Sequence, residues 1–301
     1  MKILKFLIAA AALAFAGFTV IVVLAKPVSF DDAELPQHMP DVDNGKRLFT
    51  AGGCLSCHAP PPGSGIDAAL PAGGTGLPAP VGTFYPPNIT PDRETGIGAW
   101  NDAEFISAMA YGTSPDGRHY FPAFPYTSYR YMSVSDLLDV KAYLFSLTPV
   151  RNTVSDADVP LAPVGRLLMG PWKWLAFTER PVASDPAKGE LWNRGAYLVQ
   201  GAGHCAECHT PRNLLMISKG GASFLAGGPH PEGKGKVPSL RGLIARGKYK
   251  DASDLASALA YGETFGYDNI SSGGMGKVQT NLGLLPEEDV QAIAAFLADL
   301  Q

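Results

Sequence analysis

The sequence predicts an all-α fold, in which an N-terminal transmembrane helix is followed by two tandem copies of one helical unit. Three observations predict it: a long apolar N-terminal run, two copies of one cysteine pattern with matching flanks, and a composition rich in turn residues. A chain of 301 residues suits about two domains of roughly 150 residues each. With 34 Gly, 26 Pro and 17% charged residues, short helices joined by turn-rich loops are expected, and coiled coil, collagen and wholesale disorder are excluded.

The N-terminal segment, residues 1–30, predicts a membrane anchor. Lys2 and Lys5 precede an apolar run over residues 6–25 that has one polar side chain. A spanning helix needs about 20 apolar residues, whereas the apolar part of a secretory signal has about 7–15. The length favours a retained anchor, although residues 23–25 also fit a signal cleavage site. In both cases the rest of the chain is exported, so we expect it at the inner membrane with its domains facing the periplasm.

The rest of the chain divides into two matching units, residues 40–150 and 186–301. Each begins with a Gly-containing helical pattern, carries an Ala-x-Ala-Tyr-Gly stretch, and ends with a helix of the same apolar pattern. The Gly of the middle stretch stands where a helix ends in a left-handed residue. The matched segments are 44–49 with 194–199, 108–112 with 258–262, and 142–147 with 295–300. The chain is therefore expected to be a tandem duplication.

The connecting segment, residues 151–185, carries an apolar cluster that includes Leu167, Trp172, Trp174 and Phe177. Aromatic clusters are commonly buried between packed elements, so we expect this one to pack between the two units. The alternative is a contact with a membrane interface or with a partner protein.

All four cysteines belong to two copies of Cys-x-x-Cys-His, at residues 54–58 and 205–209. This spacing lets two thiols form thioether bonds to one haem while the adjacent histidine gives the proximal nitrogen to iron. A structural zinc site is disfavoured because its two cysteine pairs usually lie about 15–20 residues apart, and a redox dithiol does not need the histidine. The sequence therefore predicts two covalently bound haem c groups. The attachment residues are Cys54, Cys57, Cys205 and Cys208, and the iron-ligating residues are His58 and His209.

The sixth iron ligand separates an electron carrier from a haem enzyme, and the second unit offers one clear candidate. Met275 is flanked by glycines, in a stretch expected to be a flexible loop. In such a loop its side chain does not belong to an apolar helix face that packs into the core. Met275 is therefore the predicted axial ligand of the second haem.

The first unit is different, because Phe124 stands near the position that matches Met275 and phenylalanine cannot bind iron. Met132, just before the last helix, is the favoured ligand, since its long side chain could reach the ring from a loop. His119 and an open or water-bound iron are the alternatives. Met109 matches a leucine in the second unit and is expected in the core.

Other polar side chains are weaker candidates for a role at a haem. Arg212 could pair with a haem propionate, because arginine makes bidentate contacts to carboxylates, or it could be an ordinary solvated side chain. His38 and His230 are expected at the surface, and His204 is poorly placed to reach the distal face of a haem.

Several longer segments resemble a known family. They are Phe84–Asp92, Ser114–His119, Pro122–Tyr129 and Trp192–Val199. They are similar to the membrane-anchored, multi-haem cytochrome c subunits that accept electrons for periplasmic dehydrogenases such as alcohol and gluconate dehydrogenases. The resemblance covers nearly all of residues 40–301 and implies class I cytochrome c domains with His/Met iron and a role in electron relay. Many members carry three haems, whereas two are expected here, and many carry Met where Phe124 stands.

We therefore expect an electron-transfer protein rather than an enzyme. A periplasmic dehydrogenase subunit would reduce one haem, and an oxidase, quinone or soluble cytochrome would oxidise the other. A net charge of −4 gives no sign of a nucleic-acid partner. Because His/Met ligation raises the potential, a difference in ligation would give the relay a direction, with the Met275 haem the higher in potential. The alternative is a di-haem enzyme of the peroxidase type with an open first haem.

Overall fold

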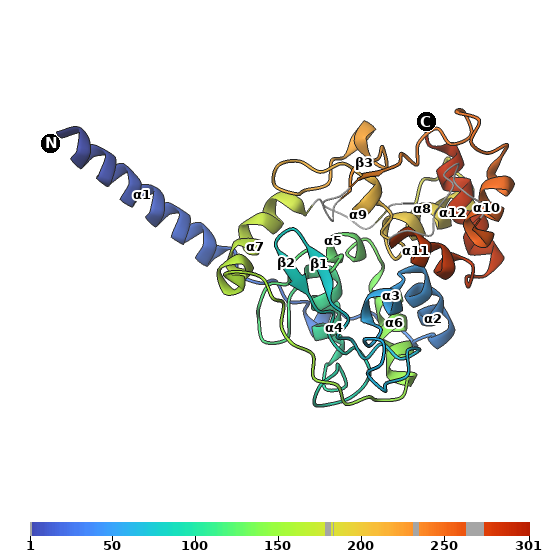
Figure 1. The fold of residues 1–301 in the computed structure, drawn as a ribbon, viewed down its shortest axis with the longest axis horizontal. Helices are drawn as coiled ribbons and strands as arrows, with labels where there is room; N and C mark the ends of the chain where they lie inside the picture. The colour runs from blue at the N-terminus through green and yellow to red at the C-terminus, as the bar shows by residue number, and fades with distance from the viewer. Residues whose placement is uncertain (1, 178–181, 183, 231–234, 263–273) are drawn as a thin grey trace.

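The computed structural model describes residues 2–177, 182, 184–230, 235–262 and 274–301, and these residues are mostly helical (Figure 1). Helix α1 (Lys2–Leu24) projects away from the rest of the molecule, and none of its residues is buried. Its length and composition are sufficient to cross a membrane, and a signal sequence would pass the same test. The expected long apolar helix is thus present at the N-terminus.

The first half contains five helices in the order expected for its predicted unit. They are α2 (Val42–Ala51), α3 (Cys54–His58), α4 (Asp102–Tyr111), α5 (Tyr126–Tyr129) and α6 (Val134–Ser146), preceded by the short η1 (Asp32–Glu34). Local signals set their ends. Asn101 and Glu104 form a capping box at the start of α4, Gly112 ends it with φ of 60°, and the Ser133 side chain accepts a hydrogen bond from the amide of Asp136 at the start of α6.

The described part of the second half follows the same order. Its helices are α8 (Glu190–Gln200), α9 (Ala206–His209), α10 (Ala252–Tyr261), α11 (Gly274–Leu282) and α12 (Glu287–Asp299), with the short η2 (Gly221–Ser223). Gly262 ends α10 with φ of 80°, as Gly112 ends α4. Both Ala-x-Ala-Tyr-Gly stretches therefore end a helix in the way that the sequence predicts.

Each half is held together by a crossing of its first and last long helices at a glycine. A Cβ atom on Gly45 of α2 would lie 1.9 Å from the carbonyl oxygen of Asp139 in α6. A Cβ on Gly195 of α8 would lie 1.9 Å from the carbonyl oxygen of Ala292 in α12. Only glycine allows two helix backbones to approach this closely. An aromatic pair packs near each crossing, Phe49 with Tyr143 and Trp192 with Phe296.

The prediction of an all-α chain is wrong in one detail, because two short antiparallel ladders are present. Strand β1 (Leu77–Ala79) pairs with β2 (Gly82–Phe84), with Leu77 opposite Phe84, and β3 (Gly228–Pro229) pairs with β4 (Lys236–Val237). Both lie in Gly- and Pro-rich loops that follow a cysteine motif. Strands of two or three residues are too short to produce a readable alternation of apolar and polar residues.

The connecting segment forms helix α7 (Ala162–Ala176), and the expected packing of its aromatic cluster is only partly correct. The Trp172 indole N–H donates to the carbonyl of Leu215 at 2.7 Å, which links α7 to the second half. Phe177 packs edge-on against Tyr126 of the first half. Trp174, by contrast, is more than half exposed, as is Leu167.

A buried lysine fixes α7 to the first half. Lys173 Nζ donates to the carbonyl oxygens of Tyr111 and Gly112, at the end of α4, at 2.7 and 2.8 Å, and lies 3.1 Å from Nδ1 of His119. Burial lowers the pKa of Lys173 to about 7. His119 also bonds through Nε2 to the carbonyl oxygen of Ala25, just after α1. The ends of α1, α4 and α7 therefore meet at one buried polar cluster.

The two halves contact each other through pairs of residues that hold equivalent positions in the two sequence repeats. Arg47 of α2 donates to the carboxylate of Asp289 in α12 at 3.0 and 3.1 Å, and Tyr197 of α8 donates its hydroxyl hydrogen to Asp136 in α6. Arg47 and Tyr197 hold matching places in the two units, as do Asp136 and Asp289. Reciprocal contacts of this kind are the pattern of an isologous interface, in which equivalent surfaces face each other about a two-fold axis.

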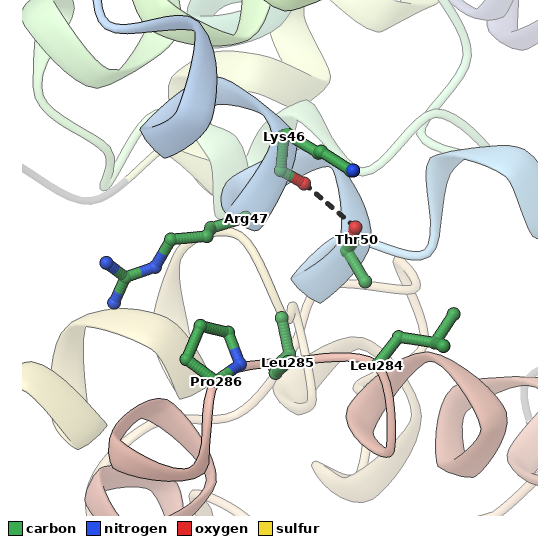
Figure 2. A pocket seen from close by; sticks show the side chains of 6 residues that line it. All are labelled: Lys46, Arg47, Thr50, Leu284, Leu285 and Pro286. Atoms are coloured by element: carbon green, nitrogen blue, oxygen red, sulfur yellow. Dashed lines mark hydrogen bonds between the residues drawn. The ribbon is translucent and has the colours of Figure 1, made fainter.

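A cavity of about 370 Å³ lies beside this interface, between α2 and the segment before α12 (Figure 2). It is lined by Lys46, Arg47, Thr50, Leu284, Leu285 and Pro286. None of these residues belongs to a cysteine–histidine motif.

Candidate functional site

Both cysteine–histidine motifs form a short helix that begins after a sharp turn. Gly53, with φ of 57°, directly precedes Cys54, the first residue of α3. His204, with φ of 38°, directly precedes Cys205, just before α9. These left-handed residues reverse the chain so that α2 and α8 are each followed at once by a motif helix. No disulfide bond joins any of the four cysteines. Among the described residues, no three or more His, Cys, Asp or Glu side chains gather as a metal cluster.

The two motif histidines have the same orientation and the same kind of partner. Nδ1 of His58 lies 2.7 Å from the carbonyl oxygen of Pro87, and Nδ1 of His209 lies 2.8 Å from that of Pro238. The spacing is 29 residues in both cases. Because a carbonyl oxygen accepts only, Nδ1 must carry the proton, which leaves the lone pair on Nε2 for a metal.

A glycine closes the loop beneath each histidine. The amide of Gly73 donates to the carbonyl of His58 at 2.6 Å, and the amide of Gly227 donates to that of His209 at 2.7 Å. Both glycines have φ near 75°, and a Cβ on Gly73 would lie 2.4 Å from the carbonyl carbon of Pro87. The close approach of these backbones holds the proline carbonyl against the histidine ring.

Burial sets the protonation of the motif side chains. Burial raises the pKa of Cys54 and of Cys205 to about 12, so both thiols are protonated at neutral pH. Burial lowers the pKa of His58 and of His209, and it outweighs the hydrogen bonds to the proline carbonyls, which raise it. Both histidines are therefore neutral at pH 7, the form in which imidazole binds iron.

Met132 lies where the sequence places it, directly before the Ser133 cap of α6, and it is buried. Its Cγ atom would lie 3.1 Å from a Cβ on Gly201, at the end of α8. The matching residue of the second unit is Leu285, which cannot bind iron. The two halves therefore cannot use this position in the same way, and ligation by Met132 stays a prediction.

Met275 is half-buried in the first turn of α11, so the prediction of a flexible loop at this residue is wrong. Two contacts hold this helix against α3. Lys277 Nζ donates to the carbonyl oxygen of Ser56 at 3.2 Å, and the side-chain amide of Asn281 donates to the Ser56 hydroxyl at 3.0 Å. Residues 263–273, the rest of the expected loop, lie outside the described residues. Ligation by Met275 also stays a prediction.

Other histidines are engaged by the protein itself. Both ring nitrogens of His119 have partners, Ala25 and Lys173, so the structure does not offer it as an iron ligand. His38 is not a free surface residue as expected, because Nε2 lies 2.6 Å from Oδ1 of buried Asp139. Met109 is buried in α4, as predicted for a core residue.

Arg212 is neither solvated nor directed to a free carboxylate. It pairs with Glu207 at 2.5 Å and donates to the carbonyl oxygens of Glu207 and Met216 at 2.9 and 2.8 Å. Glu207 also accepts from the hydroxyls of Thr127 and Ser128, at 2.6 and 2.7 Å. Propionate pairing by Arg212 stays a prediction.

These contacts bring each motif helix against the opposite half. Ser56 of α3 meets Asn281 of α11, and Glu207 of α9 meets Ser128 of α5. Ser56 and Glu207 are the same position of the Cys-x-x-Cys-His motif, and Ser128 and Asn281 match in the repeat. His204 Nε2 lies 3.1 Å from the carbonyl oxygen of Gly52, between the two motifs.

Comparison with known proteins bears on this arrangement. Residues 42–148 match the family model of cytochrome c. The chain is 41% identical over 274 residues to a protein named "Diheme cytochrome c-type" from Cereibacter sphaeroides, a match that covers 91% of this chain and 90% of that protein. The chain belongs to the diheme c-type cytochromes. This cytochrome therefore carries two covalently bound haem c groups, and its activity class is electron transfer.

Dehydrogenase subunits are also among the relatives of the cytochrome. It is 34% identical over 271 residues to "Gluconate 2-dehydrogenase cytochrome c subunit" of Pantoea cypripedii, covering 86% of this chain and 59% of that protein. It is 32% identical over 265 residues to "Fructose dehydrogenase cytochrome subunit" of Gluconobacter japonicus, covering 86% of this chain and 52% of that protein. The chain thus spans nearly all of the diheme relative and only part of the two dehydrogenase subunits.

The residues present fit two haem c groups, because each motif supplies two cysteines outside any disulfide bond and a neutral histidine whose Nδ1 is held by a carbonyl. Sequence reasoning missed Pro87 and Pro238 as partners of the histidines. A signal was available, since each proline stands the same distance after its motif and is followed two residues later by an aliphatic side chain, Ile89 or Leu240.

Gly73→Ala is expected to loosen His58 from the first haem iron. The new Cβ would displace the Pro87 carbonyl, and loss of such an outer partner weakens metal binding by about 10–100-fold. Because protons compete with iron for the imidazole, the pH at which one histidine leaves its iron should then rise by about one to two units. Acid titration of the ferric absorption spectrum measures this pH.

The matched control is Gly74→Ala. Gly74 also has a positive φ, of 100°, but its nearest atom to an added Cβ is 3.4 Å away. The control therefore carries the backbone strain without the clash. Equal acid midpoints for the two variants would show that the Pro87 carbonyl does not hold His58.

Proposed function

We propose that this chain is the membrane-anchored electron-transfer subunit of a periplasmic dehydrogenase complex. In this proposal residues 40–150 and 186–301 are tandem class I cytochrome c domains, joined by residues 151–185. A dehydrogenase subunit donates electrons, and an oxidase, quinone or soluble cytochrome of the respiratory chain accepts them. Relatives that are named as cytochrome subunits of dehydrogenases support the choice of donor.

One observation carries the proposal: two equivalent histidine sites lie on motif helices that each contact the opposite half. His58 and His209 have the same carbonyl partner at the same spacing, and each motif helix contacts the other half. When bound, haem c iron changes between its ferric and ferrous states and so carries one electron. The polypeptide attaches, orients and separates the two groups, and none of its residues needs to make or break a bond.

The same repetition supports a cytochrome c domain in the second half. The glycine crossing at Gly195, the left-handed residue before the motif and the carbonyl partner of His209 all have counterparts in residues 42–148, the part that matches the cytochrome c model. A duplicated unit would conserve this set of backbone contacts, because each places the histidine relative to the helix crossing.

Anchoring by α1 supports the proposed location. None of its residues is buried, and it is long enough to span a bilayer. Lys2 and Lys5 at its start favour a cytoplasmic N-terminus, which supports a periplasmic location for the folded part of the chain. That compartment suits covalent attachment through the four thiols.

We propose Met132 and Met275 as the sixth ligands of the first and second haem. In near-infrared magnetic circular dichroism of the oxidised protein, Met132→Leu and Met275→Leu are each expected to remove the methionine–iron charge-transfer band of one haem, about half of the wild-type intensity. Because methionine raises the potential, each variant should also lower one midpoint in a redox titration. Met109→Leu, a buried methionine of α4, is the control and should change neither.

Two closed His/Met haems would support the relay. If only Met275→Leu removes intensity, Met132 is not a ligand and the first iron is ligated otherwise or open. Binding of carbon monoxide by that iron in the wild type, together with peroxide turnover, would then contradict the relay and favour a di-haem enzyme.

A further inference from the structure

Helix α7 has its charged side facing the protein and its apolar side facing outward. Lys173 is buried, and Arg166 lies over the ring of Phe121 while pairing with Asp156 at 2.8 Å. The outward residues are Val164, Leu167, Leu168, Trp174 and Leu175. At 3.6 residues per turn these five side chains share one side of the helix. A helix on a water-facing surface has the opposite arrangement.

This apolar face begins where α1 leaves the folded part of the molecule. Ala25, the residue after α1, is buried, and a Cβ on Gly170 of α7 would lie 2.2 Å from its carbonyl oxygen. The same oxygen accepts from His119 Nε2 at 3.0 Å. Figure 1 shows α7 at the base of the projecting α1. A bilayer crossed by α1 would therefore end beside α7.

A second apolar element lies next to α7. Leu214, Leu215 and Met216 form the tip of a turn, and all three side chains are exposed. The turn is well formed, because the Asn213 side-chain oxygen accepts from the amides of Leu215 and Ile217 at 2.9 and 3.1 Å. Trp172 of α7 holds it in place through its bond to the Leu215 carbonyl.

We propose that the apolar face of α7 and the 214–216 turn rest on the surface of the lipid bilayer beside α1. This inference rests on the proposed anchoring by α1. A lipid surface is favoured over a protein partner because α1 brings the bilayer to this place, because Trp174 is of a residue type enriched at membrane interfaces, and because the charges of α7 are turned away from it. The second half of the cytochrome then also contacts the membrane, through the 214–216 turn.

Lipid photolabelling tests this contact on the intact, two-haem chain in bilayer nanodiscs of phosphatidylethanolamine and phosphatidylglycerol. A diazirine on the acyl chains is activated by light, and the labelled peptides are identified by mass spectrometry. We expect label on α1, on residues 161–175 and on residues 213–217, and no label on Leu284, which is exposed but lines the cavity beside α2. Label on α1 without label on α7 would overturn the inference and leave the anchor intact, and a protein partner would then be the occupant of the face. Absence of label on α1 would overturn both proposals.

A double variant, Leu167→Glu with Leu175→Glu, gives a second readout. In oriented multilayers, the electron paramagnetic resonance signals of the ferric haems change with the angle between the field and the membrane if the domains have a fixed orientation. The double variant is expected to lose this angular dependence while α1 keeps its lipid label, and Leu284→Glu is the matched control that should retain it. Equal angular dependence in the wild type and the double variant would contradict the inference.

Discussion

Glu207→Ala should lower the free energy of unfolding by about 3 kcal/mol or more, since removal of one partner from a buried ion pair leaves the other charge uncompensated. Glu207 and Arg212 are both largely buried, with side-chain exposures of 15% and 17%. The substitution also removes the acceptor for Thr127 and Ser128, the contact that ties the second motif helix to the first half. Guanidinium unfolding followed by far-ultraviolet circular dichroism measures the loss.

Ser56→Ala is the matched control, because Ser56 holds the same place in the first motif and makes the corresponding contact with Asn281. It removes one neutral hydrogen bond, which contributes about 1 kcal/mol. The expected order is thus a large loss for Glu207→Ala and a small loss for Ser56→Ala. Similar losses in the two variants would show that the ion pair with Arg212 does not stabilise the interface.

Gly195→Ala is expected to prevent stable folding of the second half. By helix propensity alone, alanine in place of glycine would stabilise a helix by about 1 kcal/mol. Here the new Cβ would lie 1.9 Å from the Ala292 carbonyl oxygen and 2.9 Å from Cβ of Phe296, so α8 and α12 must separate. Overpacking typically costs about 1–3 kcal/mol and occasionally more, and a clash with backbone puts this site at the upper end. The sign of the effect is therefore opposite to that of propensity.

The measurement is the haem content of the purified chain by intact mass, together with thermal unfolding. One haem per chain is the expected result if the second half no longer folds around its motif. Gly189→Ala, one residue before α8 and with no atom within 4 Å of an added Cβ, is the control and should change stability by less than about 1 kcal/mol. A Gly195→Ala protein with two haems and higher stability would contradict the close helix crossing.

The elements that local sequence encodes could be predicted. The glycine ends of α4 and α10, the serine cap of α6 and the apolar helix α1 depend on residues within one or two turns of each other. The attachment chemistry is also local, because five consecutive residues hold the thiols and the histidine. For these features the sequence is sufficient.

Features that depend on distant backbone could not be predicted. The partners of His58 and His209 are carbonyl groups, which every residue possesses, so the chemistry of Pro87 and Pro238 does not mark them. Their equal spacing from the two motifs is a signal only once the two units have been aligned. The residues around His38 in the sequence favour a surface position. Its partner Asp139 is far away along the chain, so local sequence does not reveal the contact. The flanking glycines favour a loop at Met275, whereas contacts of α11 with Ser56 hold that segment as a helix. In each case tertiary contacts outweigh the local signal.

The reciprocal interface has a consequence for how this molecule can diverge. In a symmetric homodimer every substitution is present on both sides of the axis, so the two sites change together. In this single chain the related positions hold different residues, Arg47 against Tyr197 and Ser56 against Glu207. A mutation can therefore change the surroundings of one haem site without changing the equivalent residue at the other. A difference in reduction potential between the two sites can thus evolve through single substitutions.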